Sequence, residues 1–157
     1  MTMPVRKLVV TADDFGMSVE VNEAVEQAHR DGILTSASLV VSGGAVDDAV
    51  RRARRLPGLG VGLHLALFGA PAAAPGRSSL SPDGVDLGES PVRAGIAQML
   101  SPRARADLAR EITAQAEAYR QTGLACTHLD GHWHCHQHPV VLALALDAVA
   151  ALGARAV

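Results

Sequence analysis

Short apolar runs alternate along this chain with longer segments in which apolar residues recur every three or four positions. The short runs predict β-strands, and the longer segments predict amphipathic α-helices. We expect strands at residues 6–12, 36–41, 59–67 and 125–130, and helices at residues 18–31, 44–55, 103–122 and 139–152. This alternation is typical of parallel βαβ units, so the pattern predicts an α/β fold.

Residues at the expected helix ends support these boundaries. Ser18 can cap the first helix and Gly32 can stop it. Pro102 and Pro139 stand at the start of later helices, where proline is tolerated. The last five residues, from Gly153 to Val157, indicate a helix stop and the beginning of a fifth strand.

A histidine-rich segment follows the fourth expected strand. Five of the seven histidines lie between His128 and His138, at alternate positions that they share with Asp130. An extended chain sends alternate side chains to one face, and imidazole is a common ligand for zinc and similar metals. The segment therefore predicts a metal site, with a histidine-rich loop of no function as the alternative. An expression tag does not fit, because the segment is internal and is interrupted by Trp133 and Cys135.

Two further motifs place possible ligands at the ends of earlier strands. Asp13 and Asp14 follow an apolar run, and Gly16 allows a turn directly after them. The acids could instead start a turn or cap a helix. His64 lies within an apolar run, where a buried, hydrogen-bonded histidine is the ordinary alternative. An aspartate and two histidines form a common set for a divalent metal, with zinc or magnesium as first candidates and manganese, cobalt or nickel as others.

Taken together, the motifs resemble a known family. They are Thr11–Ser18, Val21–Val25, Gly32–Val40, Val61–Leu65 and Thr127–His132. In this order they resemble the YdjC-like carbohydrate deacetylases, the family of chitooligosaccharide deacetylase, and most closely its hopanoid-biosynthesis-associated branch. The resemblance implies an irregular (β/α) barrel, a metal held by Asp14, His64 and His132, and Asp13 as general base. Such barrels typically need about 250 residues, so we expect residues 1–157 to be the N-terminal portion of one deacetylase-like domain.

The implied reaction is removal of an N-acetyl group from an amino sugar, in a chito-oligosaccharide or a glucosaminyl hopanoid. His134 is our candidate for protonating the departing amine; His136, His138 or a histidine in a later His-Pro-Gly-type motif are alternatives. Phe15, Phe68 and Trp133 are expected to contact the substrate. Two other functions stay open: a metal-dependent phosphoesterase, although the three motifs lack the basic residues it would want, and an inactive metal-binding fragment.

Residues 69–92 are rich in alanine, proline, glycine and serine, with a turn signal at Ser81–Gly84. A connection of this length is usually a lid, a binding loop or a disordered segment. It follows the strand that carries His64. We therefore expect a substrate-contacting loop over the active-site face, with disorder as the alternative.

Composition limits the remaining classes. The net charge is −2 and aromatic residues make up 3% of the chain, so the arginine run at residues 51–55 predicts a solvated helix face rather than a nucleic-acid site. No apolar run approaches the roughly 20 residues that span a bilayer. The run before Asp13 is too short for a signal peptide. Two cysteines agree with a reducing compartment, and Cys135 is a possible additional ligand. We expect a cytoplasmic protein, at the inner membrane surface for a glycolipid substrate, that forms homo-oligomers through open sheet edges.

Overall fold

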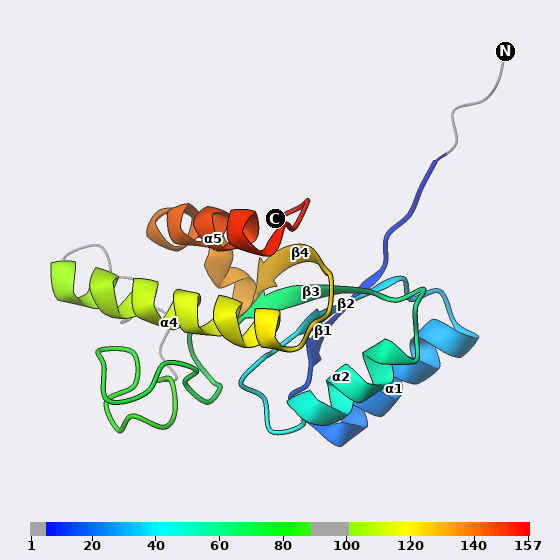
Figure 1. Ribbon diagram of the computed structural model, residues 1–157, viewed down its shortest axis with the longest axis horizontal. Helices are drawn as coiled ribbons and strands as arrows, with labels where there is room; N and C mark the ends of the chain where they lie inside the picture. Colours follow the sequence, from blue (N-terminus) through cyan, green and yellow to red (C-terminus); the bar gives the residue numbers. More distant parts are fainter. Residues whose placement is uncertain (1–5, 89–100) are drawn as a thin grey trace, which may run out of the picture.

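A computed structural model describes residues 6–88 and 101–157, and its centre is one parallel sheet (Figure 1). The four strands lie in the order in which they occur in the chain. They are β1 (Thr11–Phe15), β2 (Ser36–Leu39), β3 (Gly60–Leu65) and β4 (Cys126–Gly131). The predicted α/β class with parallel strands is confirmed.

Helices connect the strands and form two groups. Figure 1 shows α1 (Val19–Asp31) and α2 (Val46–Arg54) together near β1 and β2, while α4 (Pro102–Gln121) and α5 (Pro139–Leu152) pair near β3 and β4. A short 3-10 segment, η1 (His132–Gln137), joins β4 to α5. The predicted cap is confirmed, because the Ser18 hydroxyl accepts a hydrogen bond from the Val21 amide.

The two faces of the sheet differ in chemistry. One face carries apolar residues that form the core together with residues of α1, α2, α4 and α5: Ala37, Leu39, Val61, Leu63, Leu65 and Leu129. The opposite face carries small or polar residues: Ser36, Ser38, Gly60, Gly62, His64, His128 and Asp130. Burial of the first set stabilises the fold, and the second set leaves polar groups available on one face.

The first strand lies further along the chain than predicted. Residues 6–10 are not in a strand, and Leu8 and Val9 are 76% and 71% exposed. The ladder with β2 begins only at the pair Thr11 and Ser36, so the apolar run before it has no strand beside it in the described residues. The predicted strand at residues 6–12 therefore begins five residues too early and ends three residues too early, and both acids lie inside the observed strand.

The loop after β3 is packed against α4 over residues 69–88, and residues 89–92 of the predicted loop lie outside the described part. The predicted turn is confirmed by a hydrogen bond from the Gly84 amide to the Ser81 carbonyl, 3.1 Å long. Both carboxylate oxygens of buried Glu111 accept backbone bonds from the loop, from the amides of Ala73 and Ala74 at 2.9 Å each. Loop and helix thus form one structural unit.

The end of the chain meets the edge of β4. The Arg155 amide donates to the Thr127 carbonyl at 3.3 Å, and the Leu129 amide donates to the Ala156 carbonyl at 3.0 Å. These bonds lie where the sequence predicts a fifth strand, although they do not make up a strand.

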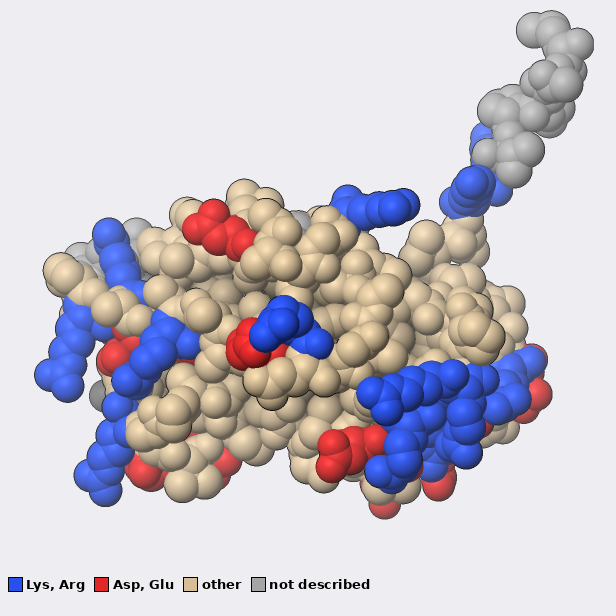
Figure 2. Space-filling model, in the orientation of Figure 1, with Lys and Arg blue, Asp and Glu red and all other residues tan. Residues whose placement is uncertain are grey.

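Charged side chains gather over α1 and α2, where Figure 2 shows arginines mixed with acids. Arg52 is paired with Asp48 at 2.6 Å and with Glu26 at 2.8 Å. The basic run is thus a helix face whose charge is partly balanced by carboxylates. In residues 6–88 and 101–157, no helix has both the length and the apolar character to cross a membrane.

Candidate metal centre

A bulge in β1 brings both neighbouring acids to one site. Ala12 pairs with Ala37 and Phe15 with Leu39, so β1 has one residue more than β2 over this interval. Asp14 has a left-handed backbone with φ of 60°, a conformation that aspartate tolerates better than most residues. In a regular strand the two carboxylates would point to opposite faces. The bulge removes that alternation, so both can approach His64.

The turn after Asp14 is held by a buried asparagine. The Asn22 side chain accepts a hydrogen bond from the Gly16 amide at 2.8 Å and donates one to the Ala45 carbonyl at 3.0 Å. Asn22 is fully buried in α1. Our sequence reasoning gave it no role, although a polar residue within the apolar stripe of a helix is a usable signal.

Asp14, His64 and His132 converge at the carboxyl-terminal edge of the sheet. One candidate ligand atom from each lies within 4.8 Å of the other two. His132 Nδ1 is 3.0 Å from Asp14 Oδ1, and His64 Nε2 is 3.5 Å from the same oxygen. They come from β1, from β3 and from the residue directly after β4. Parallel strands present their carboxyl ends at one edge, which explains the convergence of residues so distant in sequence.

The environment of His64 suits a metal ligand. The side chain is 2% exposed, and its Nδ1 is hydrogen-bonded to Asp130 Oδ1 at 2.7 Å. Its Nε2 is buried, has no hydrogen-bond partner and lies beside Asp14. A buried polar atom without a partner is costly unless something else satisfies it. A divalent cation bound by Asp14, His64 and His132 would do so, and the donor set of one carboxylate and two imidazoles fits such an ion.

Burial and nearby carboxylates act in opposite directions on His64. Burial opposes the charged imidazolium, but the hydrogen bond to Asp130 and the negative charges of Asp130, Asp13 and Asp14 together outweigh it and raise the pKa of His64. Burial also acts against the Asp130 carboxylate, yet its bonds to His64 and Ser38 lower the pKa of Asp130. Asp130 had no assigned role in the sequence, although it shares the alternation of the histidines.

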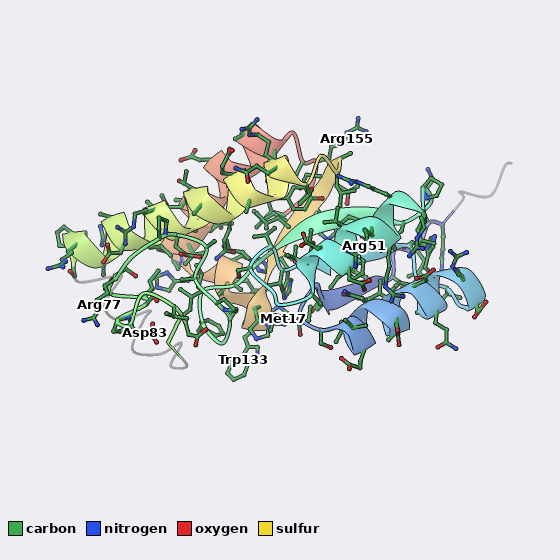
Figure 3. The ribbon with its side chains drawn as sticks, turned by 60° about the horizontal axis from the view of Figure 1, so that its bottom comes forward. Met17, Arg51, Arg77, Asp83, Trp133 and Arg155 are labelled. Atoms are coloured by element: carbon green, nitrogen blue, oxygen red, sulfur yellow. The ribbon has the colours of Figure 1, made fainter. Side chains whose placement is uncertain are left out.

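An aromatic surface adjoins His132. Trp133 is 71% exposed, and its ring stacks on that of His132 with centroids 6.0 Å apart. Phe68 contacts both rings, at 5.9 Å from His132 and 5.6 Å from Trp133. Trp133 and His134 have left-handed backbones with φ of 49° and 57°. Figure 3 shows Trp133 projecting outward from the molecule.

Three other predicted residues are not among the converging candidate ligands. Phe15 was expected to contact substrate, but it is completely buried in the core, so its side chain serves packing. His134 is exposed and its ring faces His136, with centroids 6.2 Å apart. Cys135 donates a hydrogen bond to the Leu65 carbonyl, and burial raises its pKa to about 12. Among the described residues, Cys135 is not in either group of converging candidate ligands.

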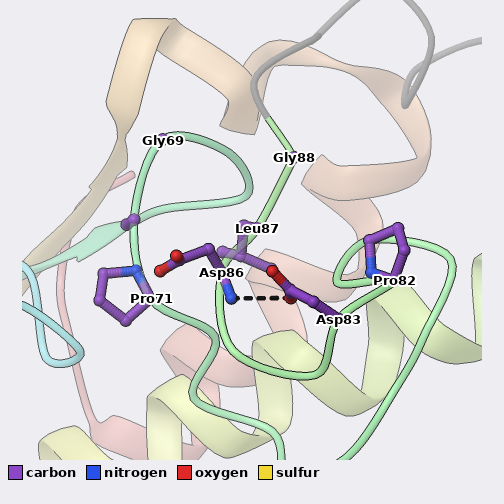
Figure 4. A pocket seen from close by; sticks show the side chains of 8 residues that line it. Gly69, Pro71, Pro82, Asp83, Asp86, Leu87 and Gly88 are labelled. Atoms are coloured by element: carbon purple, nitrogen blue, oxygen red, sulfur yellow. Dashed lines mark hydrogen bonds between the residues drawn. The ribbon is translucent and has the colours of Figure 1, made fainter.

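A cavity of about 500 Å³ lies within the loop after β3 (Figure 4). Its lining is Gly69, Ala70, Pro71, Pro82, Asp83, Asp86, Leu87 and Gly88. Asp83 shapes it by accepting a hydrogen bond from the Asp86 amide at 3.0 Å. A Cβ atom added to Gly69 would lie 3.9 Å from His132 Nε2, so one wall of the cavity adjoins the candidate metal centre.

The chain is similar in sequence to several proteins named as deacetylases. The chain is 39% identical over 140 residues to a carbohydrate deacetylase from Brevibacillus brevis, covering 89% of this chain and 54% of the relative. It is 37% identical over 162 residues to the carbohydrate deacetylase of Homo sapiens, covering 99% and 49%. A chitooligosaccharide deacetylase from Salmonella dublin is 36% identical over 152 residues, covering 94% and 57%. The chain spans about half the length of these curated relatives.

A solved structure and a family model complete the comparison. The crystal structure of a proposed cellobiose-phosphate cleavage protein from Enterococcus faecalis V583 matches with a TM-score of 0.75 and 23% identity, covering 94% of this chain and 57% of that one. This likeness shows the fold alone. The model of the YdjC-like protein family matches residues 7–157. The chain therefore belongs to the YdjC-like family.

Proposed function

We propose that this chain carries the metal centre of a carbohydrate N-deacetylase, which removes the acetyl group from an amino sugar. The observation that carries the proposal is the convergence of Asp14, His64 and His132, with the unpartnered His64 Nε2 beside Asp14. The names of the relatives supply the substrate class and the reaction. The activity is proposed for the whole protein, because this chain spans about half the length of its curated relatives.

The residues at the site divide the chemistry between them. A divalent cation held by Asp14, His64 and His132, with zinc or magnesium as first candidates, would act as a Lewis acid and lower the pKa of a water. Asp13 accepts the proton of the attacking water; a carboxylate oxygen of Asp13 lies within 4.8 Å of ligand atoms of His64 and Asp130. His134 protonates the departing amine. The support for His134 is its exposure two residues after His132.

The aromatic surface accounts for sugar binding. Trp133 offers an exposed ring next to His132, and Phe68 packs against it in a T-shaped contact. Sugar rings present apolar C–H faces that pack on such rings. We propose a chito-oligosaccharide as substrate, with the glucosaminyl hopanoid of the hopanoid-associated branch as the glycolipid alternative. For the glycolipid, the protein would work from the cytoplasm at the inner membrane surface.

We propose that the four strands are part of an irregular (β/α) barrel whose interior is the polar face of the sheet. The support is that Ser38, His64, His128 and Asp130 share this face, whereas the apolar residues form the core with the helices. In β/α barrels the catalytic residues lie at the carboxyl ends of the strands, as Asp13, Asp14, His64 and His132 do here.

The test is acetate release from diacetylchitobiose and from a glucosaminyl lipid carrying an N-acetyl group. We expect release with protein reloaded with zinc or magnesium and none after chelation. The variant His64→Ala serves as a metal-free control that keeps the rest of the surface. Metal binding without acetate release would favour the inactive fragment, and hydrolysis of p-nitrophenyl phosphate in its place would favour the phosphoesterase.

A further inference from the structure

A continuous network of hydrogen-bonded polar side chains lies on the polar face of the sheet and ends at His64. Thr127 Oγ1 is 2.8 Å from His128 Nδ1, and His128 Nε2 is 3.0 Å from Ser38 Oγ. Ser38 Oγ donates to Asp130 Oδ2 at 2.7 Å, and Asp130 Oδ1 is 2.7 Å from His64 Nδ1. The residues come from β2, β3 and β4, so the hydrogen-bond network crosses three strands.

The hydrogen bonds of this network have one consistent donor-to-acceptor direction. Ser38 has one hydroxyl proton, which it gives to Asp130, so it accepts from the N–H of His128 at Nε2. Burial lowers the pKa of His128, which keeps its ring neutral and leaves Nδ1 as an acceptor for the Thr127 hydroxyl. The Thr127 hydroxyl also lies within donating distance of the Val61 carbonyl, at 3.0 Å, and that carbonyl accepts a second hydrogen bond from the Tyr119 hydroxyl at 3.0 Å.

Both oxygens of Asp130 are therefore occupied. One receives the Ser38 hydroxyl, and the other receives the N–H of His64 at Nδ1. This matters because Asp13, His64 and Asp130 also form a compact group of potential ligands. With Asp130 and His64 Nδ1 bonded to each other, the free nitrogen of His64 is Nε2, on the side of Asp14 and His132.

Gly62 makes this arrangement possible. It lies on β3 opposite Ser38 in the register, and the ring of His128 covers it. A Cβ atom at residue 62 would overlap the His128 ring. The imidazole thus occupies the space that a side chain would need, and any larger residue would displace it.

We infer that Asp130 is a positioning residue for His64, held in place by Ser38 and His128, and that this three-residue support sets the metal affinity of the site. The inference rests on the proposed metal centre. Carboxylates behind metal-binding histidines fix the tautomer and the ring orientation, and their loss typically lowers metal affinity by about 10- to 100-fold. Ser38 and His128 do the same for the carboxylate, one step further from the ion.

The test compares two serines of the same strand. Ser36 and Ser38 are both buried in β2 on the same face. The Ser36 hydroxyl, however, donates to the Gly60 carbonyl at 3.2 Å and is not part of the hydrogen-bond network. We would titrate Co²⁺ into metal-free wild type, Ser38→Ala and Ser36→Ala, following the visible spectrum of the bound ion. Ser38→Ala should weaken Co²⁺ binding by about 10-fold, while Ser36→Ala should bind as wild type does.

Two further variants separate positioning from folding. Asp130→Asn keeps the shape of the side chain, so it should fold, yet it should weaken Co²⁺ binding at least as much as Ser38→Ala and alter the spectrum. Adding Ser38→Ala to Asp130→Asn should cost less than the two effects combined, since both act through one carboxylate. Gly62→Ala should resemble Ser38→Ala.

The outcomes are distinguishable. Equal effects of Ser36→Ala and Ser38→Ala, additive effects in the double variant, or no Co²⁺ binding by wild type would overturn the inference. Acetate release is assayed separately. If Co²⁺ binds in the expected order of variants but no acetate is released, the positioning role stands and the proposed deacetylation fails.

Discussion

Asp13 and Asp14 are adjacent in sequence but occupy different surroundings. Asp14 has the left-handed backbone and a hydrogen bond from His132, and its side chain is 39% exposed. Asp13 lies toward His64 and Asp130 instead. The difference predicts separate roles for two residues that sequence alone treats as equivalent.

Asparagine substitutions should separate these roles. Asp14→Asn should reduce bound metal, because an amide is a weaker ligand than a carboxylate. Asp13→Asn should keep the metal and lower turnover by about 100- to 10,000-fold, the usual cost of losing a general base. Elemental analysis and acetate release measure the two effects. His64→Ala and His132→Ala should behave like Asp14→Asn, and His136→Ala should retain metal. Loss of metal in Asp13→Asn alone would mean that the two roles are exchanged.

Trp133 should affect substrate binding more than chemistry. Its ring is exposed and stacks on that of His132, so Trp133→Ala removes a packing surface while the side chains of all three proposed ligands remain. We expect KM for a chito-oligosaccharide to rise about 10-fold, equivalent to about 1.4 kcal/mol, with kcat changed little. Ile33→Ala is the control, because Ile33 is 73% exposed and precedes β2 at the opposite edge of the sheet. An unchanged KM would remove Trp133 from the proposed sugar site.

At the scale of elements, the helices were predictable and the first strand was not. Caps and prolines mark helix ends by local chemistry, and Ser18 and Pro102 act as expected. A strand depends on its partner, and the register with β2 excludes Leu8 and Val9 although both favour strands. Similarly, the sequence indicated Asp14, His64 and His132 through family motifs. It did not indicate Asp130 or Ser38, whose roles depend on pairing between strands.

The turn that ends β1 should be sensitive to a single methyl group. Gly16 has φ of 98°, and a Cβ there would lie 2.9 Å from the Val40 carbonyl oxygen. We expect Gly16→Ala to lower the free energy of unfolding by about 1–3 kcal/mol, measured by urea denaturation. Gly44→Ala is the matched control, since a Cβ at residue 44 would meet only the Met17 carbonyl oxygen at 4.0 Å. Equal losses in both variants would contradict the role given to Gly16.

At the scale of the whole molecule, β1 is an open edge among the described residues. Its only strand partner there is β2, and exposed Leu8 and Val9 precede it. Unpaired edges favour association with another chain. We expect the mass measured by light scattering to rise with protein concentration, and Leu8→Lys to reduce this rise. A monomer of constant mass at all concentrations would contradict the prediction.

The two hydrogen bonds that the Glu111 carboxylate accepts from the loop after β3 also have a consequence for amide hydrogen exchange. Irregular surface loops usually exchange their amide protons quickly, because water reaches them without any opening of the fold. The amides of Ala73 and Ala74 instead donate to a carboxylate that is 3% exposed, and Gln115 accepts the amide of Ala66 in the same way. These three protons should exchange as slowly as those of α4, so deuterium uptake would group this stretch of loop with the helix rather than with the surface.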